Sequence, residues 1–373
     1  MSRIALVSAL LVTLAGSTTA WAQTNAGYPT NWSQPGRGPS MPDGWIPQMG
    51  SCYQPMPYQS PLETTYVTAD AVAFRRDWQA SQTFATLNTP TNGVLGTHDL
   101  DFVNQPGLRL LAGRRVNDCL AIEASFLGLL QWDESRAVRD LTVNSQGTTG
   151  NLFSPLTHFG SPAQVGLDFN TSASLRIISQ FNGGELNLRQ RLNTTPSIMQ
   201  ASAIYGIRYM NVHERLEYRT RSLSPVPAGT DNAVNVVTKN NLFGVQLGGA
   251  VEFRVEPRCW LSFEAKGIMF GNDAGQQTQF TTGPIGGPGA TVNGPRDQER
   301  MTFATDLAAA AVWKFTPALV GRVGYQGILV DGLAVASDNF TRNAPFMTTA
   351  PTELNHSGHL AFHGPFAGLT ATW

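Results

Sequence analysis

The stretch from Gln105 to Trp132 constrains the fold of this chain more than any other. It consists of two alternating runs joined by a short turn at Val116–Asp118. In the second run one parity is apolar: Leu120, Ile122, Ala124, Phe126, Gly128, Leu130 and Trp132. Successive side chains of a β-strand point to opposite faces, so this parity predicts an apolar face that is almost free of charge. The two runs predict a long β-hairpin whose apolar face meets either a protein core or lipid.

Alternating runs of the same kind continue to the end of the chain. We expect about ten strands, at Thr64–Arg76, Asp99–Arg115, Cys119–Trp132, Ala173–Arg191, Ile198–Arg219, Val234–Val255, Cys259–Phe270, Arg300–Phe315, Ala318–Val335 and Leu360–Trp373. Neither the helical period of an α/β protein nor a repeat of fixed length is present in the sequence. The chain is therefore expected to be all-β.

The connections between these runs alternate between short and long. The short ones are Val116–Asp118, Leu192–Ser197, Glu256–Arg258 and Thr316–Pro317. The long ones are Asp77–His98, Asp133–Ser172, Thr220–Ala233, Gly271–Glu299 and Ala336–His359. Transmembrane barrels have an even number of antiparallel strands, short periplasmic turns and longer extracellular loops. The order predicts an antiparallel up-and-down transmembrane β-barrel of about ten strands, with its long loops outside the cell.

The composition of the two strand faces agrees with a barrel in lipid. In the run Val234–Val255, one parity carries Phe243, Val245 and Leu247, and the other carries Gln246 and Glu252. Apolar residues outside and polar residues inside are the pattern of a membrane barrel, whereas a soluble barrel inverts it. We therefore expect outer-membrane lipid to cover the apolar face.

The N-terminus has the pattern of a secretory signal peptide. A basic start is followed by an apolar run from Ile4 to Ala15 and by the small-residue site Ala20-Trp21-Ala22. This run is too short for a transmembrane helix, which needs about 20 apolar residues. We predict residues 1–22 as a signal peptide cleaved after Ala22, residues 23–62 as a Pro/Gly-rich, disordered periplasmic arm, and residues 63–373 as the barrel, located in the outer membrane.

Charge and cysteine content exclude some classes of function. The net charge is -1, which removes the electrostatic case for binding nucleic acid. The mean hydropathy of -0.14 leaves any membrane role to strands. Three cysteines in an exported chain leave at least one without an intramolecular partner. A bridge from Cys52 to Cys119 or to Cys259, and three free thiols, all remain open.

The chain ends on an aromatic residue, Trp373, with Ala367, Leu369 and Ala371 alternating before it. A terminal aromatic strand of this kind is similar to the signal that the outer-membrane assembly machinery recognises. We therefore predict Trp373 as the assembly signal and that machinery as a partner.

Several motifs also carry a family resemblance. They are QPGLRLLAGRR–NDC–IEASFLGL, GELNLRQR, YGIRYMNVHE, NNLFGVQLGG and VGYQGILVDGLAVA, in this order across most of Asp99–Trp373. This series resembles the putative beta-barrel porin-7 family of bacteria. Departures are Leu120, where the family favours an aromatic residue, and long inserts within Asp133–Ser172. The resemblance implies an outer-membrane barrel and says little about transport, because "porin" is there a label based on fold.

The polar parity supplies the candidate lumen-lining residues. These are Arg109, Glu123, Glu185, Arg189, Arg208, Glu252, Arg254, Glu264, Lys266, Asp306 and Arg322. They either line a narrow, passive pore for small polar solutes or pair with one another and fill the barrel. Eight strands leave room only for side chains, and open channels need about 16–18. Ten strands therefore favour a filled or narrow lumen.

Signals for catalysis or cofactors are weak. His356, His359 and His363 have the spacing H-x2-H-x3-H, and alternation places the last two on one face. No fourth ligand or carboxylate partner follows from the spacing, and neither a nucleophile elbow nor a phosphate loop is present in the sequence. We predict no cofactor, no metal and no enzymatic activity. The alternatives are a surface binding or adhesion barrel that acts through its long loops, and an outer-membrane hydrolase with a site at the rim.

Overall fold

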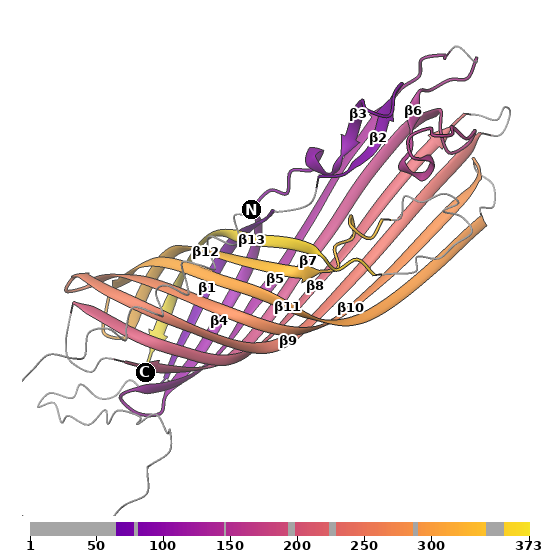
Figure 1. Ribbon diagram of the computed structural model, residues 1–373. Helices are drawn as coiled ribbons and strands as arrows, with labels where there is room; N and C mark the ends of the chain where they lie inside the picture. The colour runs from indigo at the N-terminus through magenta and orange to yellow at the C-terminus, as the bar shows by residue number, and fades with distance from the viewer. Residues whose placement is uncertain are drawn as a thin grey trace, which may run out of the picture. The chain divides into compact units, whose positions relative to one another are not determined.

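The computed structural model describes residues 65–77, 81–144, 147–192, 198–223, 229–285, 290–340 and 354–373. All of them belong to one compact unit, Cys52–Trp373. Ten strands close a barrel (Figure 1): β1 (Thr65–Asp77), β4 (Gln105–Arg115), β5 (Leu120–Arg139), β7 (Asn170–Arg191), β8 (Met199–Ser222), β9 (Thr230–Glu256), β10 (Cys259–Pro284), β11 (Ala290–Lys314), β12 (Leu319–Leu333) and β13 (Gly358–Thr372). Each is antiparallel to both neighbours, and the pairing of β1 with β13 completes the ring. The predicted ten-stranded antiparallel barrel is confirmed.

The short turns and both strand termini lie at one end of the barrel. Thr65 and Trp373 exchange two backbone hydrogen bonds of 3.0 Å across the closing pair of strands. The Asn117 side chain holds the turn between β4 and β5, because its Oδ1 accepts from the backbone N–H groups of Cys119 (2.9 Å) and Leu120 (2.8 Å). An asparagine that binds its own turn in this way explains why two long strands are joined by so few residues.

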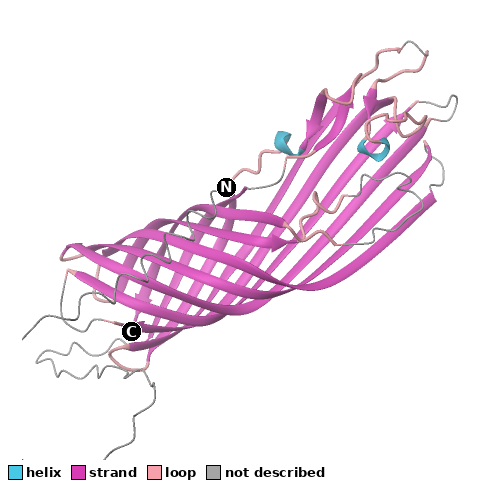
Figure 2. Ribbon diagram, viewed as in Figure 1, coloured by secondary structure: helices cyan, strands magenta, loops and turns pink. Residues whose placement is uncertain are grey.

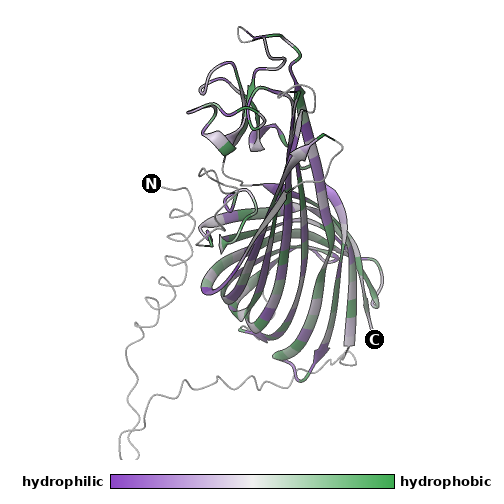
Figure 3. Ribbon diagram, turned by 90° about the vertical axis from the view of Figure 1, so that its right-hand side faces the viewer, coloured by the Kyte–Doolittle hydropathy of each residue, from purple (hydrophilic) through white to green (hydrophobic). Residues whose placement is uncertain are grey.

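The outer surface of the barrel carries an apolar belt. On β9 it runs from Phe243 to Val255, and these two side chains are 61% and 60% exposed. Twelve steps of about 3.4 Å cover roughly 40 Å of strand, and a strand tilt of about 40° reduces this to a height of roughly 30 Å. That is the thickness of the hydrocarbon layer. Figure 3 shows the apolar and polar residues alternating along the strands.

Beyond the belt, several strands continue far past their predicted ends. The segments Thr220–Ala233 and Gly271–Glu299 were expected to be long external loops, and the predicted lengths are wrong, because only residues 223–229 and 285–289 lie between the strands. The ladder between β9 and β10 continues residue for residue up to Thr230 opposite Pro284, and that between β10 and β11 up to Thr282 opposite Ala290. Polar outward residues such as Asp273 and Gln277 hid these strands, because a polar face suggests a loop when the other face has mixed character.

The predicted outward orientation of Leu130 and Trp132 is wrong, because β5 contains a β-bulge just before them. The register between β5 and β7 shifts between Leu127 and Leu130, and Leu129 adopts a positive φ of 64°. One extra residue reverses the faces of the strand beyond it. Leu130 and Trp132 are therefore buried inside, whereas Leu129 and Phe126 face outward.

Three short strands form an extension of the sheet at the long-loop end (Figures 1 and 2). The hairpin of β2 (Thr83–Leu87) and β3 (Gly93–Gly96) pairs with β6 (Leu152–Phe153), which pairs with β7. The 3-10 turns Thr97–Asp99 and Pro155–Thr157 complete the regular elements of the described residues. In this part of the chain, no helix is long and apolar enough to cross a membrane.

Two of the three cysteines lie in the described part of the chain. Cys119 is disulfide-bonded and Cys259 is free. Cys52, the predicted signal peptide (residues 1–22) and the predicted arm (residues 23–62) lie outside the described residues, so they stay predictions.

Candidate functional site

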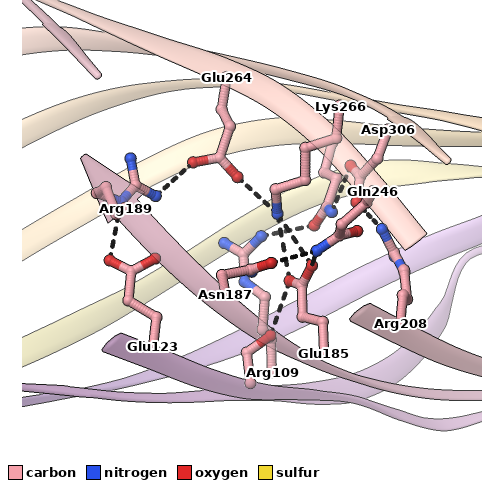
Figure 4. A network of polar contacts seen from close by, with 12 residues as sticks. Arg109, Glu123, Glu185, Asn187, Arg189, Arg208, Gln246, Glu264, Lys266 and Asp306 are labelled. Carbon is pink, nitrogen blue, oxygen red and sulfur yellow. Dashed lines mark hydrogen bonds and ion pairs between the residues drawn. The ribbon is translucent and has the colours of Figure 1, made fainter. Parts of the chain in front are cut away.

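The half of the lumen nearer the short turns contains a chain of charged groups from β5, β7 and β10 (Figure 4). Arg189 donates from Nε to Glu123 Oε1 (2.8 Å) and from Nη2 to Glu264 Oε2 (2.7 Å). Lys266 Nζ then joins Glu264 (2.8 Å) to Glu185 (3.2 Å). Charges of alternating sign along this row neutralise one another within the barrel.

A second group of charges lies beside the first. Asp70 accepts from Arg109 Nε and from Arg322 Nε, each at 2.7 Å. Arg208 Nη1 donates to Asp306 Oδ2 (2.7 Å), and Gln326 Nε2 donates to Asp306 Oδ1 (2.8 Å). These side chains come from five strands, so the contacts cross the lumen instead of following one wall. We call both groups together the lumen charge network.

Nine of the eleven predicted lumen-lining residues take part in this network: Arg109, Glu123, Glu185, Arg189, Arg208, Glu264, Lys266, Asp306 and Arg322. The other two do not join it. Glu252 lines the cavity at the short-turn end, and Arg254 is exposed. Neither has an ion pair within the described part of the chain.

Sequence reasoning missed Asp70, although it receives two arginines and is 1% exposed. The alternation in the first strand could have predicted that Asp70 faces the lumen, since Thr68 and Asp70 alternate with Val67 and Ala69. Its partner Arg322 is 252 residues away, so no spacing rule could connect the two.

The other half of the lumen, nearer the long connections, is filled by apolar side chains. Inward residues of the strands meet side chains from the connections, and both belong to one buried cluster. Phe181 and Phe362 have ring centroids 4.8 Å apart, and Phe84 contacts Phe340 at 4.9 Å. We call this cluster the apolar lumen core. Protein interiors of this kind are close-packed, so the lumen is occupied at this level.

The segment Leu333–Phe340, at the end of β12 and beyond it, is folded into the apolar lumen core. Its backbone at Ala334 exchanges two hydrogen bonds with the side chain of Asn240 (2.9 and 2.8 Å). The N–H of Ala336 donates to Glu214 Oε2 (3.1 Å), and Glu214 also accepts from Arg76 Nε (2.9 Å). We call Leu333–Phe340 the inserted segment.

The ion pair of Arg76 and Glu214 is fully buried, with side chains 0% and 1% exposed. The Arg76 guanidinium also lies 4.5 Å from the centre of the Phe102 ring. Removing one partner of such a pair costs about 3–5 kcal/mol, because the other charge stays buried without compensation. The pair therefore joins β1, β8 and the inserted segment at the level of the apolar lumen core.

Towards the short turns, the lumen opens into a cavity of about 380 Å³. Its lining includes Tyr66, Glu123, Arg189, Glu252, Trp260 and Glu264. We call this cavity the vestibule. Its lining mixes charged and apolar side chains, it lies on the short-turn side of the apolar lumen core, and its volume suits a small molecule.

The three C-terminal histidines do not come together. His363 faces outward, where its Nδ1 contacts Tyr325 Oη (2.5 Å) and its Nε2 contacts Asp77 Oδ2 (2.8 Å). His356 Nδ1 lies 2.8 Å from the carbonyl of Leu354. Among the described residues, no group of three His, Cys, Asp or Glu side chains is placed to hold a metal ion. Since both ring nitrogens of His363 are engaged, this residue is poorly placed to act as a base or a ligand.

Residues 65–363 match the family described as putative beta barrel porin-7. The match covers most of the chain, which therefore belongs to this family. Together with the apolar belt, this defines an outer-membrane β-barrel protein. No curated protein sequence matches the chain.

Three solved barrels illustrate the likeness in fold. The outer membrane protease OmpT from Escherichia coli is 12% identical, with a TM-score of 0.40, and the match covers 83% of this chain and 97% of that one. A major outer membrane protein from Thermus thermophilus is 8% identical (TM-score 0.28; 83% and 99% covered). The P. putida toluene transporter TodX is 9% identical (TM-score 0.28; 84% and 90% covered). Likeness at this level carries no argument about activity.

Proposed function

We propose that this protein is a filled outer-membrane barrel, closed to passive diffusion in this conformation. The observation that carries the proposal is the apolar lumen core, which the inserted segment completes. An ion entering it would lose its hydration shell, and polar groups at this level, such as Arg76 and Glu214, are already paired with each other. This is prohibitive for a charged solute. The vestibule is then a pocket closed at its inner end by the apolar lumen core. The lumen charge network stabilises the barrel and does not select solutes for transport.

The test is the conductance of the refolded full-length protein in a planar bilayer. We expect no current steps from protein that is already shown to be folded by its heat-dependent shift in gel mobility. A variant in which a Gly/Ser linker of equal length replaces Leu333–Phe340 should conduct, because it removes both the apolar filling and the contacts to Asn240 and Glu214. Stable steps from the unaltered protein would contradict the closed barrel.

A second candidate is a surface-binding barrel, and the sheet beyond the belt favours it. Strands of 24 to 27 residues, together with the hairpin of β2 and β3, support a platform outside the apolar belt. Binding sites are commonly carried on loops that a rigid scaffold positions. Replacing residues 141–168 by a short Gly/Ser linker should abolish attachment of cells that display the protein, while the gel shift of the barrel persists. Attachment at the original level would exclude this part of the chain.

A further inference from the structure

A cluster of basic side chains lies on the outer face of β8 and β9, just beyond the belt. Tyr209 and Phe243 are opposite each other and are the last large apolar pair. Asn211 and Asn241 follow, with a hydrogen bond of 2.8 Å between them. His213 and Lys239 are opposite each other on the next outward positions, with Arg215 and Arg219 farther along β8. We call His213, Arg215, Arg219 and Lys239 the external basic patch.

The patch holds more positive charge than its neighbours neutralise. Glu217 is shared by Arg215 (2.9 Å) and Arg219 (3.5 Å), so one carboxylate serves two guanidinium groups. Within the described ranges, Lys239 has no ion pair, and the buried Nε2 of His213 has no hydrogen-bond partner.

The exposed arginines beside this patch are matched by carboxylates, because Arg176 pairs with Asp133 and Arg221 pairs with Asp231. On the adjacent face of β10 and β11, Asp273 lies opposite Glu299, and Gly275 lies opposite Asp297. The contrast between these acidic residues and the unmatched positive charge of Arg215, Arg219 and Lys239 points to an anionic ligand at β8 and β9.

We propose that the external basic patch binds the phosphate group of a lipid in the outer leaflet. Phosphate oxygens accept readily from ammonium and guanidinium groups such as those of Lys239, Arg215 and Arg219. Tyr209, directly below, is of the residue type that membrane proteins place at headgroup level. Arg215, Arg219 and Lys239 carry three positive charges against the single carboxylate of Glu217, and this excess matches the charge of a phosphate group.

The height of the patch selects a lipid over a free phosphate ion. His213 and Lys239 lie four residues beyond Tyr209 and Phe243, about 13 Å along the strand and about 10 Å above the belt at a tilt of about 40°. Headgroups occupy roughly the first 5–8 Å beyond the hydrocarbon. Lysine and arginine side chains that lean down along the strand span the difference.

The experiment measures thermal unfolding of the full-length protein in detergent with three probes at equal concentration. They are a bis-phosphorylated glucosamine lipid, the same lipid after removal of its phosphates, and inorganic pyrophosphate. A ligand that binds only the folded protein raises its unfolding temperature. We expect the phosphorylated lipid alone to do so, with K239Q and R215Q each weakening its apparent affinity about fivefold.

The matched control is R139Q, which removes an exposed arginine from the far end of β5 and should leave the affinity unchanged. Equal responses of K239Q, R215Q and the unaltered protein would overturn the proposal. An equal response to pyrophosphate would also overturn it, because the ligand would then be free phosphate. An equal response to the dephosphorylated lipid would show that acyl chains, not the patch, carry the binding.

Discussion

At the scale of single residues, the end of β1 depends on a side chain far away in sequence. Phe74 is opposite Gln105, the first residue of β4, so it is the last residue of β1 in that ladder. Trp132 Nε1 of β5 donates to the Phe74 carbonyl at 3.1 Å inside the barrel. This hydrogen bond ties β1 to β5 beyond the end of the ladder between β1 and β4.

The variant Trp132→Phe tests this hydrogen bond. It keeps an aromatic ring in the apolar lumen core but leaves the Phe74 carbonyl without its donor, and we expect a loss of about 1–3 kcal/mol in the free energy of unfolding. Urea unfolding in detergent measures it. Trp313→Phe is the control, because Trp313 lies on the outer face, and its change should stay within about 0.5 kcal/mol. Equal losses in the two variants would refute the role of Trp132.

The buried pair of Arg76 and Glu214 gives a second prediction at this scale. Arg76→Met alone should lower the free energy of unfolding by about 3–5 kcal/mol, since Glu214 is then buried as an unpaired charge. The double variant Arg76→Met/Glu214→Leu should recover most of that loss. A double-mutant cycle by urea unfolding measures both. If the double variant were as unstable as the sum of the single ones, the pair would not be the source of the loss.

At the scale of elements, the inserted segment carries a titrating group. Asp338 lies in it, outside the strands, and burial, followed by the nearby charge of Glu214, raises the pKa of its carboxyl above the ordinary value. A raised pKa in the folded state means that the neutral form is favoured there. The stability of the folded protein with a neutral Asp338 is therefore fully present below the usual pKa of the carboxyl, and it is lost as the pH rises through the raised pKa.

Asp338→Asn should therefore stabilise the protein at pH 7 and have little effect at a pH below the ordinary value of the carboxyl. The comparison of unfolding temperatures at the two pH values measures the effect. Asp331→Asn, an exposed change at the end of β12, is the control and should leave the unfolding temperature unchanged at both. A stabilisation that is the same at low and neutral pH would contradict the titration of Asp338.

The elements also show what the sequence could predict and what it could not. Alternation and loop length were sufficient for the number of strands, because each depends only on neighbouring residues. The reversal of faces at the bulge was not predicted, although Leu127 and Leu129 interrupt the alternation at that place. Parity gave nine members of the lumen charge network but not their pairing, since Asp70 and Arg322 are 252 residues apart. The pairing of Arg76 with Glu214 joins residues 138 apart and likewise required the closed ring.

At the scale of the whole molecule, we expect closure of the barrel and its assembly into the membrane to be separable at Trp373. Its backbone pairs with Thr65, while its side chain is 63% exposed. Trp373→Ala should therefore refold in detergent as well as the unaltered protein, yet reach the outer membrane less efficiently in cells. Fractionation of membranes measures this, with Phe315→Ala, another exposed aromatic residue beside a short turn, as the control. Unchanged assembly of Trp373→Ala would remove its role as the signal.

The continuation of β9 past the belt has a consequence for encounters in solution. The thirteen residues from Thr230 to Leu242 carry the sheet roughly 30 Å above the hydrocarbon at a tilt of about 40°. The Debye length is about 8 Å at physiological ionic strength, so the field of an anionic membrane surface has almost vanished there. A charged partner meeting Arg221 and Asp231 would respond to the charges at the strand tips alone, and its association rate would be independent of the lipid below.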